Sequence, residues 1–137
     1  MVEVFTANLI ICNSENKVLL VKRASSDSES GKWSIPGGTI EKNESIIRAL
    51  HREIKEELNC SIKTHTFLVL KKQFSDQKRV SSYYYVGTIT GEIKLNPIEL
   101  SEYNWFSIPE ISQLELAFNQ NSLFSKFELE IININNV

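Results

Sequence analysis

Three glutamates lie close together on one side of a segment with the pattern of an amphipathic helix, residues 44–58. With about 100° of rotation per residue, Glu53, Glu56 and Glu57 share an arc of about 100°. The neighbouring arc is filled by apolar residues, which are Ile46, Ile47, Leu50, Ile54 and Leu58. The helix is therefore predicted to bury its apolar side in a core and to hold the carboxylates at the border of that core.

The spacing of these acids needs an explanation, because Glu53 has Glu57 at the i+4 position, where like charges destabilise a helix. Partial burial would push the acids toward their protonated forms. A divalent cation would remove the repulsion, and three carboxylates supply the all-oxygen ligands that suit Mg²⁺ or Mn²⁺. Because such ions bind substrate phosphates, the cluster indicates metal-dependent phosphate chemistry. An acidic face in contact with solvent is the alternative, and the spacing alone leaves both open.

The residues around the glutamates extend the pattern. Gly38 is followed after five residues by Glu44, and after seven more by Arg-Glu-Ile-Lys-Glu-Glu at 52–57. This arrangement resembles the Nudix box: glycine, five residues, glutamate, seven residues, then Arg-Glu-apolar-any-Glu-Glu-any-Gly-apolar. Asn59 stands where the box has glycine, and Cys60 fills the last apolar position. A left-handed helix cap is expected there, and asparagine tolerates it at a small cost in stability.

The resemblance implies a single Nudix hydrolase domain over 1–137, with the box at 38–60. The implied fold class is α/β (α+β), a mixed β-sheet sandwiched between α-helices, with the box as a loop–helix–loop. The implied reaction is Mg²⁺- or Mn²⁺-dependent hydrolysis of a nucleoside diphosphate linked to another moiety. A nucleoside triphosphate, intact or damaged, giving monophosphate and pyrophosphate is favoured for a small domain. The alternatives are an ADP-ribose or dinucleoside polyphosphate hydrolase, or a non-catalytic nucleotide-binding regulatory module.

The resemblance also assigns roles within the box. It implies that Glu53, Glu56 and Glu57 bind the metal, and that the backbone carbonyl of Gly38 is a further candidate ligand. Glu53 is the candidate general base. Arg52 is expected to orient a catalytic glutamate. Glu44 is expected in the first helical turn, where a carboxylate interacts favourably with the helix dipole.

Candidates outside the box are less specific. Arg23 resembles a residue that meets substrate phosphates, with an ordinary surface charge as the alternative. Gly37 and Gly38 are expected to let backbone approach those phosphates. Glu99 and Glu102 are candidates for an additional acid at the metal, although acids in loops are usually solvated.

The elements that position these residues can be predicted from the order of apolar and turn-forming residues. Residues 4–12 and 17–23 are predicted to form a β-hairpin, and 24–32 a mobile loop. Further strands are predicted at 33–35, 61–74, 80–90 and 102–106. Helices are predicted at 44–58, from a capping box at 107–110 to about 116, and at 122–132, with a frayed end at 133–137.

Composition limits the remaining choices. The 137 residues carry 15 Lys and Arg against 17 Asp and Glu, so the net charge of −2 argues against a long nucleic acid as partner. No apolar run reaches the roughly 20 residues of a membrane span, and the N-terminus lacks a signal-peptide pattern. Cys12 and Cys60 are expected to be buried thiols. These features predict a cytoplasmic protein with a small nucleotide substrate, and homodimers are common among the proteins it resembles.

Overall fold

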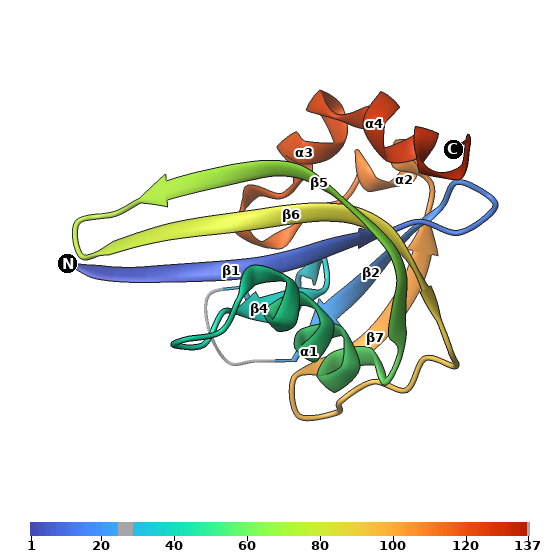
Figure 1. Cartoon of the computed structure of the whole chain (residues 1–137). Coiled ribbons are helices and arrows are strands. Elements are labelled where there is room, and N and C mark those ends of the chain that lie inside the picture. Colours follow the sequence, from blue (N-terminus) through green and yellow to red (C-terminus); the bar gives the residue numbers. More distant parts are fainter. Residues whose placement is uncertain (25–28, 137) are drawn as a thin grey trace.

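The computed structural model describes residues 1–24 and 29–136, and Figure 1 shows long strands with helices on both sides. The larger sheet contains, in spatial order, β4 (Gly37–Thr39), β1 (Val2–Ile11), β6 (Lys78–Thr90) and β5 (Ser61–Phe74). The central pair, β1 and β6, is parallel, from Val2 opposite Lys78 to Ile11 opposite Gly87, and the other pairs are antiparallel. This sheet therefore mixes parallel and antiparallel neighbours, as the predicted fold class requires.

The second sheet is antiparallel and contains β3 (Trp33–Ser34), β2 (Val18–Arg23) and β7 (Leu100–Phe106). The predicted hairpin of residues 4–12 and 17–23 is wrong, because β1 and β2 belong to different sheets and meet at an isolated bridge between Cys12 and Val18. Both strands are central in their sheets, and β2 and the second half of β1 are buried, so each takes its partners from distant parts of the chain.

Helix α1 (Ile46–Leu58) carries the glutamates. It begins two residues later than predicted because Ser45 is the N-cap, and its hydroxyl accepts a hydrogen bond of 3.1 Å from the backbone N–H of Arg48. Its C-cap is Asn59 in the left-handed conformation, with φ 58° and ψ 30°, as predicted for the position where the box has glycine. Glu44 consequently lies before the helix.

The two sides of the larger sheet are packed by different helices. On one side, Leu50, Ile54 and Leu58 of α1 are fully buried, which confirms the predicted apolar arc. The other side is covered by the C-terminal elements α2 (Ile108–Ile111), η1 (Ala117–Asn119), α3 (Asn121–Lys126), α4 (Glu128–Ile132) and η2 (Asn133–Asn136). The capping box of Ser107 and Glu110 is confirmed, but α2 ends before residue 116. The predicted helix 122–132 is interrupted at Phe127.

Part of the predicted loop at 24–32 cannot be assessed, since residues 25–28 lie outside the described residues, as does Val137. Within 1–24 and 29–136, no helix is long and apolar enough to cross a membrane.

Candidate active site

Arg52 lies at the centre of the charged cluster on α1. Its Nε and Nη2 donate to the two carboxylate oxygens of Glu44, at 2.7 and 2.9 Å. Its Nη1 donates to Glu53 at 2.9 Å and to Glu56 at 3.2 Å, and Nη2 also donates to the backbone carbonyl of Thr39 at 2.9 Å. A planar guanidinium can make this set of contacts, whereas an ammonium group cannot. Arg52 thus holds the carboxylate of Glu53, and its expected role of orienting a catalytic glutamate stays a prediction.

Glu44 has a different surrounding from the one predicted. It precedes the helix, so it does not lie in the first turn, and its Oε1 also accepts from the backbone N–H of Glu41 at 2.9 Å. The hydrogen bonds from Arg52, followed by that backbone bond, lower the pKa of Glu44 to about 2. Glu44 therefore remains ionised and holds Arg52 in place.

Glu57 is the most buried acid of the cluster, with 6% of its surface exposed. Burial, helped by the charges of Glu53 and Glu99, raises its pKa to about 8. The backbone N–H of Gly37 acts in the opposite direction, donating to Glu57 Oε1 at 2.8 Å. Burial also raises the pKa of Glu53, against the lowering effect of Arg52. Because burial and mutual repulsion disfavour the ionised forms of Glu53 and Glu57, a nearby cation would stabilise these carboxylates.

The two glycines of β4 leave no room for side chains. A Cβ atom on Gly38 would meet the carboxylate of Glu53, and one on Gly37 would meet the backbone oxygen of Ala7 and the side chain of Asn8. Strand β4 pairs with β1 at the same positions, Gly38 opposite Ala7 and Gly37 opposite Asn8. Glycine at 37 and 38 therefore lets this backbone lie directly against the acids of α1.

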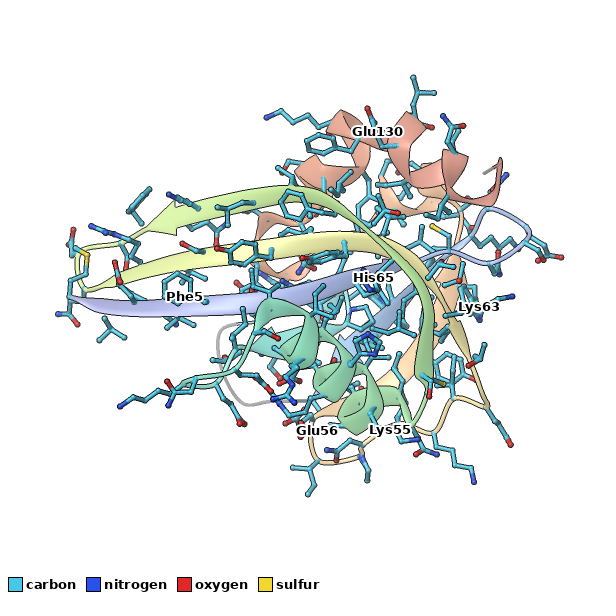
Figure 2. The ribbon with its side chains drawn as sticks, in the orientation of Figure 1. Phe5, Lys55, Glu56, Lys63, His65 and Glu130 are labelled. Carbon is cyan, nitrogen blue, oxygen red and sulfur yellow. The ribbon has the colours of Figure 1, made fainter. Side chains whose placement is uncertain are left out.

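The acids are suited to a hard divalent cation by chemistry, since all three offer carboxylate oxygens. In the conformation of the structure, no three acidic, histidine or cysteine groups of the described residues converge on one point. The reason is that Glu53 and Glu56 turn toward Arg52 while Glu57 turns toward Gly37. The Glu56 side chain is 54% exposed, and Figure 2 shows it on the side of α1 away from the long strands, so it can rotate.

Of the two acids outside the box, Glu99 is the one whose charge acts on the cluster. It raises the pKa values of both Glu53 and Glu57. Glu102 instead lies 3.9 Å from the ammonium group of Lys22 on the neighbouring strand.

A cavity of about 340 Å³ opens beside the acids, within the range of small-molecule sites. Glu57, Gly37, Gly38 and Arg23 are among the residues that line it. The Arg23 guanidinium lies over the ring of Phe118, 4.9 Å from its centroid. The structure thus brings Arg23 and the glycines to the same cavity as the buried glutamate.

The cavity is also lined by Phe118 and Gln120, which the sequence reasoning missed. Phe118 and Asn119 both have left-handed backbone, with φ 56° and 55°. Asparagine adopts this conformation readily, but for the bulky Phe118 it costs about 1–3 kcal/mol. Next to them, buried Gln120 accepts from the backbone N–H of Ile35 at 2.9 Å and donates to the Tyr84 hydroxyl at 3.3 Å. No periodic pattern marks these residues, because Phe118 and Asn119 lie in the short helix η1, whose backbone departs from helical geometry at Phe118, and Gln120 is its C-cap.

Comparison with known proteins agrees with this geometry. The NUDIX domain family model matches residues 3–127. The 8-oxo-dGDP phosphatase NUDT18 of Danio rerio is 35% identical over 69 residues, 50% of this chain and 21% of that protein. The 8-oxo-dGTP diphosphatase of Proteus vulgaris is 32% identical over 78 residues, 56% of this chain and 70% of that protein. The crystal structure of the MutT protein from Methanosarcina mazei Go1 superposes with a TM-score of 0.82 at 25% identity, covering 93% of this chain and 94% of that chain. The chain therefore belongs to the Nudix hydrolase family, and its structural neighbours include MutT-like members of that family.

Proposed function

We propose that this protein hydrolyses a nucleoside triphosphate to a nucleoside monophosphate and pyrophosphate, with Mg²⁺ or Mn²⁺ as cofactor. The observation that carries the proposal is the position of buried Glu57, which accepts from Gly37 and opens onto a cavity large enough for a nucleoside. The names of the relatives from Danio rerio and Proteus vulgaris, an 8-oxo-dGDP phosphatase and an 8-oxo-dGTP diphosphatase, support a nucleotide substrate.

Glu53, Glu56 and Glu57 would hold the metal, and the carbonyl of Gly38 is a further candidate ligand beside Glu53. When bound, the metal would neutralise charge on the phosphates and stabilise the leaving group. Glu57 is kept in place by the N–H of Gly37, and Arg23 lines the same cavity, where a guanidinium can pair with a phosphate.

Glu53 is the candidate general base. Arg52 donates to one of its oxygens, Oε1, at 2.9 Å, which fixes the carboxylate while leaving the other oxygen to accept a proton from water. The water oxygen then forms a bond to the α- or β-phosphorus, and the α–β anhydride bond breaks with its electron pair on the bridging oxygen. That oxygen leaves with pyrophosphate if the α-phosphorus is attacked, or with the nucleoside monophosphate if the β-phosphorus is attacked. Glu44 keeps Arg52 charged and oriented throughout.

The test is to incubate the purified chain with nucleoside triphosphates, oxidised purine triphosphates, ADP-ribose and a dinucleoside polyphosphate. Each reaction is run with Mg²⁺, with Mn²⁺ or with EDTA, and phosphate and pyrophosphate are assayed separately. Metal-dependent release of pyrophosphate from a triphosphate is the expected result. Turnover of only the linked compounds would overturn the substrate, and nucleotide binding without turnover would favour a regulatory module.

A further inference from the structure

Phe118 has a backbone conformation that its own side chain makes costly. In residues 1–24 and 29–136, five residues other than glycine have a positive φ. Four of them are asparagines, which adopt this conformation readily, and the fifth is Phe118, with φ 56° and ψ 29°. Such strain persists only where the surrounding structure imposes it, and it is found most often at functional sites. The position of this ring therefore needs a cause outside η1.

Strand β5 imposes the conformation through two side chains. The side-chain amide of Gln73 donates to the carbonyl of Phe118 at 3.2 Å. The ammonium group of Lys71 donates to the carbonyl of Asn119 at 2.8 Å and to the hydroxyl of Ser122 at 3.2 Å. Lys71 and Gln73 are two residues apart, so both side chains leave β5 on the same side. The backbone at 118 and 119 is thus held to the long strands at two successive carbonyls.

The ring that these contacts hold lies against the guanidinium of Arg23. The Cζ atom of Arg23 is 4.9 Å from the ring centroid, inside the range of roughly 6 Å for a cation–π interaction. Arg23 ends β2, and the pairing of β2 with β7 shifts its register between Lys22 and Arg23. Irregularities of this kind re-aim a side chain next to active sites. Arg23 and Phe118 both line the cavity that contains Glu57.

The charge of Arg23 acts on the buried acid of the site. Burial raises the pKa of Glu57, and the positive charge of Arg23 opposes that rise. A phosphate bound beside Glu57 would therefore meet the guanidinium, whose N–H groups suit phosphate oxygens. A mobile arginine side chain loses conformational entropy when it binds a ligand. A ring that fixes the guanidinium beforehand reduces this cost.

We propose that Phe118 is a positioning residue, which holds the guanidinium of Arg23 in the orientation that pairs with the phosphates of the substrate. The ring acts through Arg23 and needs no nucleobase for its effect. The proposal rests on the proposed function, because that function assigns Arg23 to the phosphates. An effect transmitted by Arg23 should disappear when Arg23 is replaced.

The test is a double-mutant cycle on the dissociation constant for inorganic triphosphate, measured by calorimetry with Mg²⁺. Inorganic triphosphate has no base, so stacking of a base on Phe118 contributes nothing to its binding. Phe118→Leu removes the aromatic ring and keeps an apolar side chain, and Arg23→Gln removes the positive charge. Phe118→Tyr keeps an aromatic face for the guanidinium and should bind like wild type.

Phe5→Leu is the matched control. Phe5 is 42% exposed, against 41% for Phe118, and it lines a separate surface pocket on the part of β1 that extends beyond α1 (Figure 2). Its replacement should leave the dissociation constant unchanged. Lys71→Met is a second variant, which keeps the test valid if Phe118→Leu does not fold. Lys71 does not line the cavity, so its replacement should weaken binding only where Arg23 is present.

Phe118→Leu is expected to raise the dissociation constant for inorganic triphosphate by roughly 2- to 30-fold, the effect of losing one cation–π interaction. In the Arg23→Gln protein, the same change should alter the constant by less than about 2-fold. An equal increase with and without Arg23 would show that the ring acts by another route and would overturn the proposal. The proposal also fails if Phe118→Leu binds like wild type, or if Phe118→Tyr binds as weakly as Phe118→Leu.

The release of pyrophosphate by the wild-type protein tests the proposed function separately. If pyrophosphate is released and the cycle shows no coupling, only the role of Phe118 is overturned. If the cycle shows coupling and no triphosphate is hydrolysed, the proposed function fails, while Phe118 still positions Arg23 for phosphates. Wild-type protein that does not bind inorganic triphosphate overturns the role of Phe118, whatever its activity on nucleotides.

Discussion

Replacing Glu57 with glutamine should stabilise the metal-free protein while abolishing its activity. Burial raises the pKa of Glu57 from 4.5 to about 8, so folding favours its protonated form. The stability contributed by this proton is fully present below pH 4.5 and is lost as the pH rises through 8. Glutamine has no charge to bury, and its side-chain oxygen can still accept from Gly37.

The size of the effect follows from the same pKa. At pH 7 the unfolded chain has released the Glu57 proton while the folded chain mostly retains it, which costs about 3 kcal/mol at about 1.4 kcal/mol per pH unit above 4.5. Glu57→Gln is therefore expected to raise the free energy of unfolding by about 3 kcal/mol at pH 7 in EDTA. At pH 4 both states are protonated, and the expected difference is close to zero.

Urea unfolding followed by tryptophan fluorescence, in EDTA at pH 4 and pH 7, measures both values. Glu56→Gln is the matched control, since that side chain is 54% exposed and its loss should change the stability by no more than about 1 kcal/mol. A Glu57→Gln protein that is less stable than wild type at pH 7, or that shows the same difference at both pH values, would refute the reasoning. With Mg²⁺ present, its kcat should fall at least about 100-fold.

Three further substitutions test the surroundings of the site. Arg52→Lys keeps the charge but loses the paired hydrogen bonds to Glu44, so kcat should fall about 10- to 100-fold with little change in KM in steady-state assays. Gly38→Ala should lower kcat by about 100-fold because its Cβ displaces the carboxylate of Glu53, and a far-UV spectrum like that of wild type would show that the fold survives. Asn59→Ala should lower the free energy of unfolding by about 1 kcal/mol in thermal melts, whereas Asn59→Gly should not lower it. The kcat of both variants should equal that of wild type. An unchanged melting temperature for the alanine variant would contradict the role of the left-handed cap.

The local features of this chain could be predicted because their causes lie within a few residues. The spacing of acids and apolar residues predicted helix α1 and its buried arc, since both follow from the helical repeat. The left-handed cap at Asn59 and the capping box of Ser107 and Glu110 could also be predicted, because each depends on residues close together in the sequence.

Strand pairing and the side-chain contacts of the site could not be predicted in this way. Two adjacent strands with a polar turn between them normally form a hairpin, but β1 and β2 separate because both are central strands of different sheets. Glu44 was predicted to lie in the first helical turn and interact with the helix dipole. Its partner in the structure is Arg52, eight residues away, which is brought close because the helix begins after the N-cap at Ser45. Phe118 and Gln120 enter the site only through tertiary contacts.

The parallel pairing of β1 with β6 has a consequence for the order in which the polypeptide acquires structure. Val2 lies opposite Lys78, so the longest partner of β1 is translated 76 positions after it. Until that segment has left the ribosome, the edge of β1 that pairs with β6 has no strand partner, although α1 and β2, which pack against Leu9, Ile10 and Ile11, are already translated. Nascent chains from which residues 78–87 have not yet emerged should therefore present an unpaired strand edge to chaperones, and closure of the domain is expected to be a late, cooperative event of synthesis.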